Sequence, residues 1–486
     1  MSNFYLEKQI EFVKQLLNES VDVADRVFQK NQQKLAFVFV KSIINQELLS
    51  SAVYFPLQTF QGELSIENIK DSILKVVEVK IVSKQEIEDE ILNGRIIIFA
   101  DFDDRILSVD LFKIPTRAPS EPPTTPVLQG PREGFVEDFQ TNITLIRRRI
   151  KSAKLVLDTV EVGQFTKTKV TICHLAGVAR KDIVDKVTEK IKNIKIDGIV
   201  DSYYVLSFLQ EHPSSLFKQV GNSEKPDVIA SKLLEGKVAV IVDGSPIVLS
   251  VPFVFLEDLQ SSNDYYTNHH YASFVRIIRF IALLISVVSS GFYISLQLYH
   301  YNIIPLNFLI TIADTTQGLP FTPFLEILFI FLLFQILYEV SLRLPSYLGL
   351  ATSVVGALIL GDTGVKAGLI SPPAVIIVAL CKIALYTMPE QSSQITVLQF
   401  LFIIIGGSLG LAGIIAGLIY LINYLNTLDS YQTPYLAPYS PRNSNNLKDA
   451  ILASSPTKLQ EKPKNFAKKK VKNRWKIHFL SDKRGF

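Results

Sequence analysis

The chain of 486 residues is too long to fold around one compact core, so at least two domains are expected. Apolar residues make up 48% of it and its mean hydropathy is +0.26, which is too high for an ordinary soluble protein. The net charge of +4 conceals a basic C-terminal segment, because residues 429–486 carry 13 Lys and Arg against four Asp and Glu, leaving about −5 for the rest (4 − 9). Cys173 and Cys381 fall in different halves, which argues against a disulfide framework.

The N-terminal segment is predicted to form an amphipathic helix over about residues 4–29. Its charged side chains are scattered among apolar ones, so it lacks the uninterrupted apolar stretch of a secretory signal. We therefore expect the soluble half of the chain to lie in the cytoplasm. Residues 35–40 and 95–100 are apolar runs typical of buried strands. Alternating helices and strands predict a small α/β subdomain over residues 1–113.

A proline-rich segment, residues 114–134, connects this subdomain to the next. Its proline content excludes a helix or a central strand. It forms either a disordered linker or an extended segment that packs on a surface. The residue chemistry by itself favours the linker.

A second α/β subdomain is predicted over residues 135–273. Helices are expected over residues 144–153 and 178–194, and strands over 155–157 and 169–172. Residues 238–242 and 246–251 predict a hairpin closed at Asp243-Gly244 by a type I′ turn.

Three consecutive arginines, Arg147, Arg148 and Arg149, lie on the first of these helices. Such a cluster could bind phosphate or nucleic acid. A solvated helix face or an ion-pair surface between domains is the favoured interpretation, and no nucleic-acid partner is expected.

No catalytic constellation is present in the sequence. It contains neither a Walker A loop nor a nucleophile elbow. The adjacent His269 and His270 are poorly spaced for chelation and are expected to form a solvated pair near a membrane surface. We therefore predict a protein that is not an enzyme and that holds no metal or cofactor.

The C-terminal half is predicted to be a helical transmembrane domain over residues 274–428. Between residues 280 and 428 only eight side chains carry charge. A span needs about 20 apolar residues. The candidates are residues 280–298, 319–342, 347–360, 367–388 and 391–428, the last of which is long enough for one tilted or broken helix.

The distribution of charge restricts the number of crossings. Arg276 and Arg279 precede the first span, and the loop over residues 299–320 lacks Lys and Arg, which places the soluble half inside. The basic tail, residues 429–486, is expected inside as well, so the number of crossings must be even, four or six. Residues 347–360 form the weakest candidate, and residues 303–312 could add a short sixth element.

Polar groups at membrane depth are candidates for a pore or gate. Glu326 lies near the start of its span, where it could equally be an interfacial or helix-terminal charge. Asp362 and Lys366 fall in a glycine-rich stretch that is most simply a polar turn. A segment rich in small residues could pack helices closely or line a narrow pore, and packing is favoured. The candidates in that segment are Thr352, Ser353 and Val355.

Several ordered motifs resemble the A subunit of bacterial spore germinant receptors over about residues 114–450. In the soluble half they include Pro119, Ser120, Glu121, Pro122, Pro123, Gly130, Pro131, Arg132, Glu133, Gly134, the three arginines 147–149, Asp197-Gly198 and Asp243-Gly244. In the membrane half they include the segments that end at Pro345 and Pro372. Because the proline-rich segment belongs to this resemblance, we expect it to be ordered after all.

The resemblance implies a receptor subunit in the inner membrane of the dormant spore. It implies a transporter-like B subunit and a lipoprotein C subunit as partners, and a homo-oligomer that forms or gates a pathway for ion release. A secondary transporter component and a scaffold that docks a cytoplasmic sensor remain alternatives. Whether the germinant binds this chain or its partner stays open.

Two features qualify the resemblance. Related sequences often carry further charges along the second span, where this chain has Phe331, Gln335 and Tyr338. A role for that helix in ion passage is therefore less secure. The basic tail could bind anionic membrane lipid, or it could be a solvated segment that only sets orientation.

Overall fold

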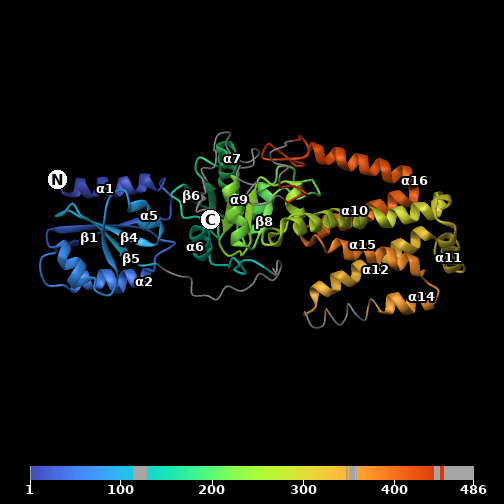
Figure 1. Cartoon of the computed structure of the whole chain (residues 1–486), viewed down its shortest axis with the longest axis horizontal. Coiled ribbons are helices and arrows are strands. Elements are labelled where there is room, and N and C mark those ends of the chain that lie inside the picture. The colour runs from blue at the N-terminus through green and yellow to red at the C-terminus, as the bar shows by residue number, and fades with distance from the viewer. Residues whose placement is uncertain are drawn as a thin grey trace, which may run out of the picture.

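The computed structural model describes residues 2–112, 129–345, 349, 356, 358–442 and 449–453. Two β-sheet subdomains and a bundle of helices follow one another along the long axis of the molecule (Figure 1). This arrangement confirms the fold class expected from the sequence, a soluble region of two subdomains followed by an α-helical membrane domain.

The first subdomain is a five-stranded antiparallel sheet between two layers of helix. The strands follow the order β1 (Val23–Lys30), β2 (Gln33–Val40), β4 (Arg95–Ala100), β5 (Ile106–Asp110) and β3 (Val79–Val82). Side chains of β2 alternate between two cores, as the period of a strand requires. One face is covered by α1 (Ser2–Leu16) and α5 (Ile87–Leu92). The other is covered by α2 (Gln46–Leu48), α3 (Phe55–Thr59), α4 (Ile66–Asn68) and π-helical turns over Leu49–Tyr54 and Ile69–Ile73.

The predicted helix over residues 4–29 is wrong in its second half. Helix α1 ends at Leu16, and Asn18 and Glu19 adopt positive φ angles that reverse the chain. The following residues form β1, which pairs with β2 in a tight hairpin. The sequence pattern misled because β1 is an edge strand whose charged residues face solvent, and their spacing also suits a helix.

The second subdomain repeats the strand order of the first. Its antiparallel sheet runs β6 (Leu155–Val162), β7 (Thr168–Leu175), β9 (Val238–Val242), β10 (Val248–Val251) and β8 (Gly221–Ser223). Helices α6 (Phe139–Arg149) and α9 (Pro226–Glu235) cover one face. Helices α7 (Lys181–Lys192) and α8 (Ser202–Leu209) cover the other.

The predicted hairpin between residues 238 and 251 is confirmed, but its turn differs. Strand β9 ends at Val242 and β10 begins at Val248, so five residues rather than two connect the strands. Only Gly244 has a positive φ, at 83°, whereas a type I′ turn needs two such residues. Pro246 also cannot adopt a positive φ, which favours the longer loop.

A buried ion pair connects the two subdomains. Arg147 on α6 donates to both carboxylate oxygens of Asp22, at 2.9 and 3.1 Å, and also to Ser20. The side chains of Arg147 and Asp22 are only 3% and 7% exposed. The interpretation of this cluster as an ion-pair surface between domains is confirmed for Arg147.

Three helices of the C-terminal half are long and apolar enough to cross a membrane: α10 (His269–Tyr299), α12 (Pro323–Arg343) and α16 (Ser392–Thr427). Helix α15 (Pro372–Leu385) is apolar but shorter, at about 21 Å for its 14 residues. Shorter helices α11 (Leu306–Thr316) and α14 (Gly364–Lys366) lie at the end of the bundle farthest from the sheets (Figure 1).

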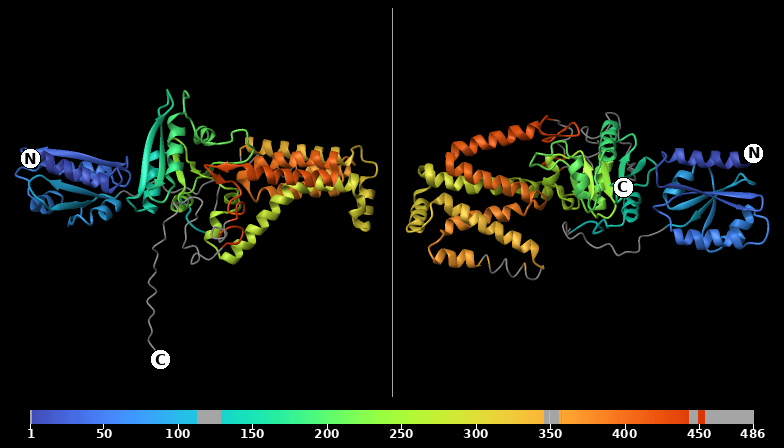
Figure 2. Two further views of the ribbon diagram at one scale, coloured as in Figure 1. Left: turned by 90° about the horizontal axis from the view of Figure 1, so that it is seen from above. Right: turned by 180° about the vertical axis from the view of Figure 1, so that it is seen from behind.

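Helix α16 is broken at Gly410, which has φ 62° and ψ −152°. The two arms meet toward the far end of the bundle and diverge toward the sheets (Figure 2). Of the alternatives for residues 391–428, the broken helix is therefore the one that forms. Each arm has enough residues for a short crossing of its own.

The chain returns to the second subdomain after α16. A two-residue ladder, β11 (Asp429–Ser430) with β12 (Thr433–Pro434), places Tyr431 and Tyr435 in buried positions. Tyr435 accepts a backbone hydrogen bond from Phe255 at 2.9 Å. The predicted tail, residues 429–486, therefore begins with a folded segment. The chain enters and leaves the helical bundle on the same side, which an even number of crossings requires; the number itself stays a prediction.

Candidate functional site in the membrane domain

Glu326 lies in the first turn of α12 and is 1% exposed. Its carboxylate accepts a hydrogen bond from the backbone N–H of Ser371, at the start of α15. Helix α15 begins with Pro372 and Pro373, which have no N–H groups, so the Ser371 N–H is a backbone donor that the carboxylate can satisfy. The negative charge is also stabilised by the positive end of the helix dipole. Glu326 therefore faces the interior of this chain, and its role in a pore or gate stays a prediction.

Other polar groups surround this carboxylate. The Tyr293 hydroxyl on α10 accepts from Gln297 at 2.9 Å. The hydroxyl of Ser371 interacts with that of Tyr293, and the buried side-chain oxygen of Gln297 has no partner among the described residues. Unsatisfied groups at this depth are costly, so this part of the bundle is a candidate for a bound water or ion.

Lys382 is a second buried charge that the sequence analysis treated as a residue reaching toward the membrane surface. The structure instead places it between helices, 6% exposed, where it donates to Gln335 at 3.1 Å. Its ammonium group also lies 4.5 Å from the centre of the Phe331 ring. Gln335 and Phe331, both on α12, thus contact one lysine of α15. The signal available in the sequence was a lone cation inside a span.

Helices α10 and α16 approach each other through glycines. A Cβ atom at Gly291 would lie 2.2 Å from the carbonyl oxygen of Phe402, and one at Gly406 would lie 2.3 Å from that of Gly291. Small residues permit such contact between membrane helices. Beside this contact, Ser290 lies 3.3 Å from the sulfur of Cys381.

The remaining pore candidates differ in their surroundings. Asp362 lies in the π-helical segment Ile359–Thr363 and Lys366 at the end of α14, where they form an exposed ion pair at 2.8 Å. This stretch is therefore helical and not the polar turn expected from the sequence. Thr352, Ser353 and Val355 lie outside the described residues, and so do Pro119, Ser120, Glu121, Pro122 and Pro123.

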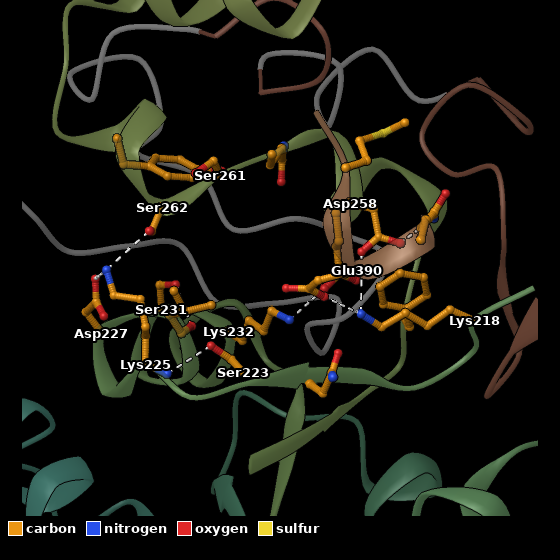
Figure 3. Close-up of a pocket in the computed structure, with 18 of the residues that line it drawn as sticks. Lys218, Ser223, Lys225, Asp227, Ser231, Lys232, Asp258, Ser261, Ser262 and Glu390 are labelled. Atoms are coloured by element: carbon orange, nitrogen blue, oxygen red, sulfur yellow. Dashed lines mark hydrogen bonds and ion pairs between the residues drawn. The ribbon is translucent and has the colours of Figure 1, made fainter. Parts of the chain in front are cut away.

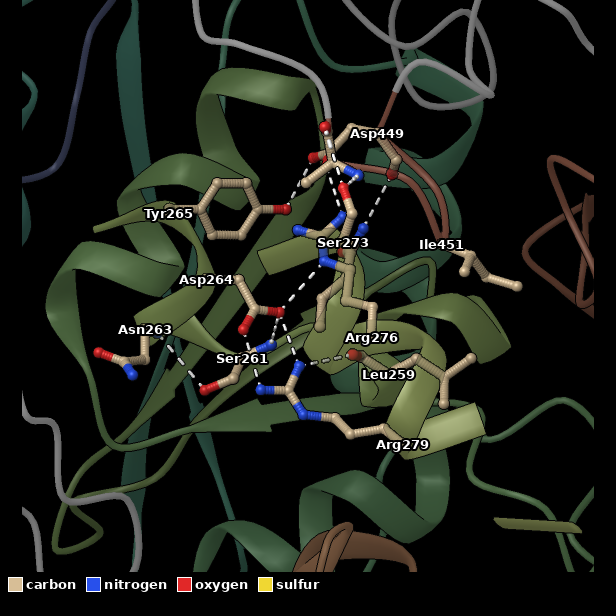
Figure 4. A network of polar contacts seen from close by, with 12 residues as sticks. Leu259, Ser261, Asn263, Asp264, Tyr265, Ser273, Arg276, Arg279, Asp449 and Ile451 are labelled. Atoms are coloured by element: carbon tan, nitrogen blue, oxygen red, sulfur yellow. Dashed lines mark hydrogen bonds and ion pairs between the residues drawn. The ribbon is translucent and has the colours of Figure 1, made fainter. Parts of the chain in front are cut away.

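The start of α10 is held to the soluble region by a buried polar network (Figure 4). Arg276, 1% exposed, donates to Asp264 at 3.1 Å and to Asp449 at 2.7 Å. Arg279 contacts Asp264 at 2.7 Å and the carbonyl oxygen of Leu259 at 3.0 Å. The charges of these two arginines predict the orientation of the chain in the membrane. They are neutralised by Asp264, which precedes the membrane domain in the sequence, and by Asp449, which follows it.

The soluble motif residues have structural roles. Glu133 pairs with Arg148 at 3.1 Å and with Arg149 at 2.7 Å. Gly130, with φ 110°, lies against the ring of Tyr266. Gly244 donates its N–H to Glu137, and Asp197 accepts from Phe165 beside Gly198. Among the described residues, no group of three His, Cys, Asp or Glu side chains could hold a metal ion.

The two sheets, the apolar helices and the charged junction between them define a multidomain protein associated with a membrane. Residues 11–465 match the family model described as Bacillus/Clostridium GerA spore germination protein, and the chain belongs to this family.

Several relatives extend this result. Spore germination protein KA of Bacillus subtilis (strain 168) is 33% identical over 92% of this chain and 84% of its own length. Spore germination protein GerQA of Bacillus cereus is 32% identical over 92% of this chain and 90% of its own. A crystal structure of the N-terminal domain of the A subunit of the Bacillus megaterium spore germinant receptor GerK3 is 27% identical, covering 51% of this chain and 94% of that one, with a TM-score of 0.39.

Proposed function

We propose that this chain is a non-enzymatic membrane subunit of a spore nutrient-germinant receptor, and that it forms or gates an oligomeric pathway for ion release. Membership of the family supports the receptor role. The observation that carries the ion pathway is Glu326, a buried carboxylate held between α12 and α15. Ionisable groups are costly in a membrane and concentrate where ions or protons move.

The oligomer is proposed to form along α12. The apolar stretch of this helix is 22% buried within the chain, against 39% for that of α10 and 33% for that of α16. The exposed residues are Leu325, Phe329, Leu332, Ile336 and Leu342. Lipid or a second copy of the chain can cover this surface, and in the proposed oligomer copies of the chain do so in part.

The partners follow from the receptor role. A transporter-like B subunit and a lipoprotein C subunit complete the proposed complex in the inner membrane of the spore, with both termini of this chain on the cytoplasmic side. The germinant binds the partner, this chain, or both. A secondary transporter and a scaffold are the alternative functions, and each gives a different result in the following test.

The test compares Glu326→Gln with Glu339→Gln in the complete receptor reconstituted in liposomes. Glutamine at position 326 can still accept the hydrogen bond from Ser371, so assembly should survive. Glu339 lies on the same helix but is exposed and paired with Arg343, which makes it a matched control. We expect germinant-triggered monovalent-cation flux to fall about tenfold in Glu326→Gln, a change of about 1.4 kcal/mol in the barrier, and to be unchanged in Glu339→Gln.

Equal flux in both variants, with complete assembly, would contradict the ion-pathway role of Glu326. Saturable germinant uptake without cation release would favour the transporter. A receptor that assembles but never conducts would favour the scaffold.

A further inference from the structure

A cavity of about 520 Å³ lies between the second subdomain and the loop that joins α15 to α16. Its other walls come from the β8–α9 turn, from α9 and from the segment between β10 and α10 (Figure 3). Three charged side chains at its edge hold the loop to the soluble region, and we call them the loop clamp. They are Lys218, between α8 and β8, Asp258, in η3 (Phe255–Leu259), and Glu390, in η7 (Pro389–Gln391) of the loop.

Lys218 connects the two carboxylates of the loop clamp. Its ammonium group lies 2.5 Å from Glu390 and 3.6 Å from Asp258. The side chains of Lys218 and Asp258 are only 11% and 6% exposed, and Gln391 of the loop also donates to Asp258. Burial lowers the pKa of Lys218, but the two carboxylates outweigh this effect and hold the pKa above its usual value. The ammonium group is therefore charged at neutral pH, and its removal would leave a buried carboxylate without its cation.

The loop is a direct extension of α15. The backbone N–H groups of Tyr386, Thr387 and Met388 each donate to a carbonyl oxygen in the last turn of that helix, at 3.1–3.2 Å. Met388 is 3% exposed and packs in the same apolar cluster as Phe253 of the soluble region. The position of the loop clamp therefore fixes the position of the C-terminal end of α15.

The opposite end of α15 carries the contact with Glu326. Ser371 directly precedes the helix, and its N–H donates to the Glu326 carboxylate. Along the helix, Ala374, Val378 and Cys381 are fully buried. A single packed helix of 14 residues, about 21 Å long, thus connects the loop clamp to the buried carboxylate.

We propose that Lys218 is a positioning residue for Glu326, which acts through the loop and α15 to keep the Ser371 N–H against the Glu326 carboxylate. Hydrogen-bond networks and rigid helices are the elements that carry coupling between distant sites. The inference rests on the proposed function. It adds the route by which the second subdomain regulates the carboxylate of the ion pathway.

The test measures hydrogen–deuterium exchange of the Ser371 amide by mass spectrometry, on the full-length protein in lipid nanodiscs. The two prolines that follow Ser371 have no amide hydrogen, so few other amides contribute to a peptide that spans this position. Lys218→Met removes the cation of the loop clamp. We expect the Ser371 amide to exchange about tenfold faster in this variant, which corresponds to about 1.4 kcal/mol of lost protection. Unchanged exchange would overturn the proposal.

Lys232→Met is the matched control. Lys232 lines the same cavity and is 15% exposed, but its described partners, Glu257 and Ser250, both belong to the soluble region. Exchange at Ser371 should therefore stay at its wild-type rate. Equal acceleration in Lys218→Met and Lys232→Met would reveal a general loss of stability and would contradict a positioning role.

Two further variants test the same contact if Lys218→Met fails to fold. Glu390→Ala breaks the contact from the loop, where the side chain is 42% exposed, and should also speed exchange at Ser371. Lys218→Arg keeps the charge, and the adjoining cavity has room for the longer side chain, so its exchange should match the wild type. Wild-type exchange in Glu390→Ala, or fast exchange in Lys218→Arg, would count against the loop clamp.

These measurements need neither germinant nor ion flux, so they separate the two proposals. Unchanged exchange at Ser371 would remove the positioning role of Lys218 and leave the flux result for Glu326→Gln standing. Faster exchange in Lys218→Met, together with normal flux in Glu326→Gln, would support the positioning role and remove the ion-pathway role of Glu326.

Discussion

Arg147 and Asp22 form the ion pair most completely withdrawn from solvent at the contact of the two subdomains. Replacing Arg147 with Met would leave the Asp22 carboxylate buried beside Ser20 and Ser42 without its cation. Loss of one partner of a buried pair costs about 3–5 kcal/mol. We expect a large drop in the thermal unfolding midpoint, measured on the full chain by circular dichroism.

Arg148→Met is the control for this change, since Arg148 lies on the same helix but is 39% exposed. Its midpoint should stay near the wild-type value, because exposed pairs contribute about 0–1 kcal/mol. The double variant Arg147→Met/Asp22→Asn should recover part of the loss. An equal effect of Arg147→Met and Arg148→Met would show that the subdomain contact does not depend on this pair.

Glu235 makes stability depend on pH near neutrality. Burial raises the pKa of Glu235 to about 7, with Glu257 and Asp449 adding to the rise and Lys237 and Lys232 opposing it. The folded protein therefore holds a proton that the unfolded chain releases at about pH 4.3. Stability falls as the pH rises through this interval, since the folded state binds more protons.

The variant Glu235→Gln removes this titration. It should raise the unfolding midpoint at about pH 8 and leave it nearly unchanged at about pH 5, where Glu235 is protonated in the folded state. Midpoints measured at both pH values test the difference. A gain of the same size at both would mean that packing, and not ionisation, limits stability at this position.

Some site residues could be read from the sequence and others could not. Glu326 was identifiable because a carboxylate inside an apolar span stands out. Its partner Ser371 was not, since a backbone N–H at the start of a distant helix leaves no mark in the sequence. The cavity-lining residues Asn222 and Asp227 were missed for a related reason: each belongs to an ordinary polar stretch, and only the fold buries one of their side-chain oxygens without a hydrogen-bond donor among the described residues.

At the scale of elements, the contact of α10 with α16 depends on two glycines. An alanine at Gly291 or Gly406 would place its Cβ 2.2 or 2.3 Å from backbone oxygen, and the helices would have to separate. We expect either variant to lower the yield of folded protein and its midpoint in nanodiscs. Overpacking typically costs about 1–3 kcal/mol, occasionally more.

Gly361→Ala is the matched control, because a Cβ there would meet nothing within 4 Å and the backbone needs no positive φ. Its midpoint should match the wild type. If Gly291→Ala proved equally harmless, the close approach of the two helices would not contribute to the stability of the bundle.

Strands that are continuous apolar runs were predicted well. Strands β2 and β4 are continuous apolar runs flanked by turns, and both lie in the centre of their sheet. Edge strand β1 was mistaken for helix, because its burial does not alternate strictly along the strand and the adjacent Arg26 and Val27 are both exposed. The break at Gly410 was only one of several options, since a glycine permits a bend but does not require one.

At the scale of the whole molecule, the two sheets share one strand order although their sequences gave no sign of it. The topology of a sheet depends on which faces of its strands are apolar. Many different residues can satisfy that requirement. The same reasoning explains the return of the chain to the second subdomain after α16. Tyr431 and Tyr435 are buried there, yet in the sequence they resemble ordinary residues of a proline-rich tail.

This return makes the C-terminal segment part of the junction between the sheets and the membrane helices. Asp449 accepts from Arg276 and from Tyr265, and Ala450 accepts a further hydrogen bond from Arg276 at 2.8 Å. Truncation after residue 442 would leave Arg276, buried at the start of α10, with Asp264 as its remaining carboxylate in the described network. The expected loss of stability is about 1.5–3 kcal/mol, the scale of one hydrogen bond to a charged group.

Truncation after residue 453 is the control, since it keeps these contacts and removes only the residues that follow. Limited proteolysis of nanodisc samples, read by mass spectrometry at sites between residues 260 and 280, distinguishes the two. Arg276 holds η4 (Ser262–Tyr265) against α10 through Asp264 and Tyr265, and Asp449 contacts Arg276 and Tyr265 from the C-terminal segment. Because the shorter chain lacks Asp449, we expect cleavage at these sites only there. Equal protection in both truncations would mean that Asp264 alone secures the junction, and the C-terminal segment would then be dispensable for coupling the soluble region to the first membrane helix.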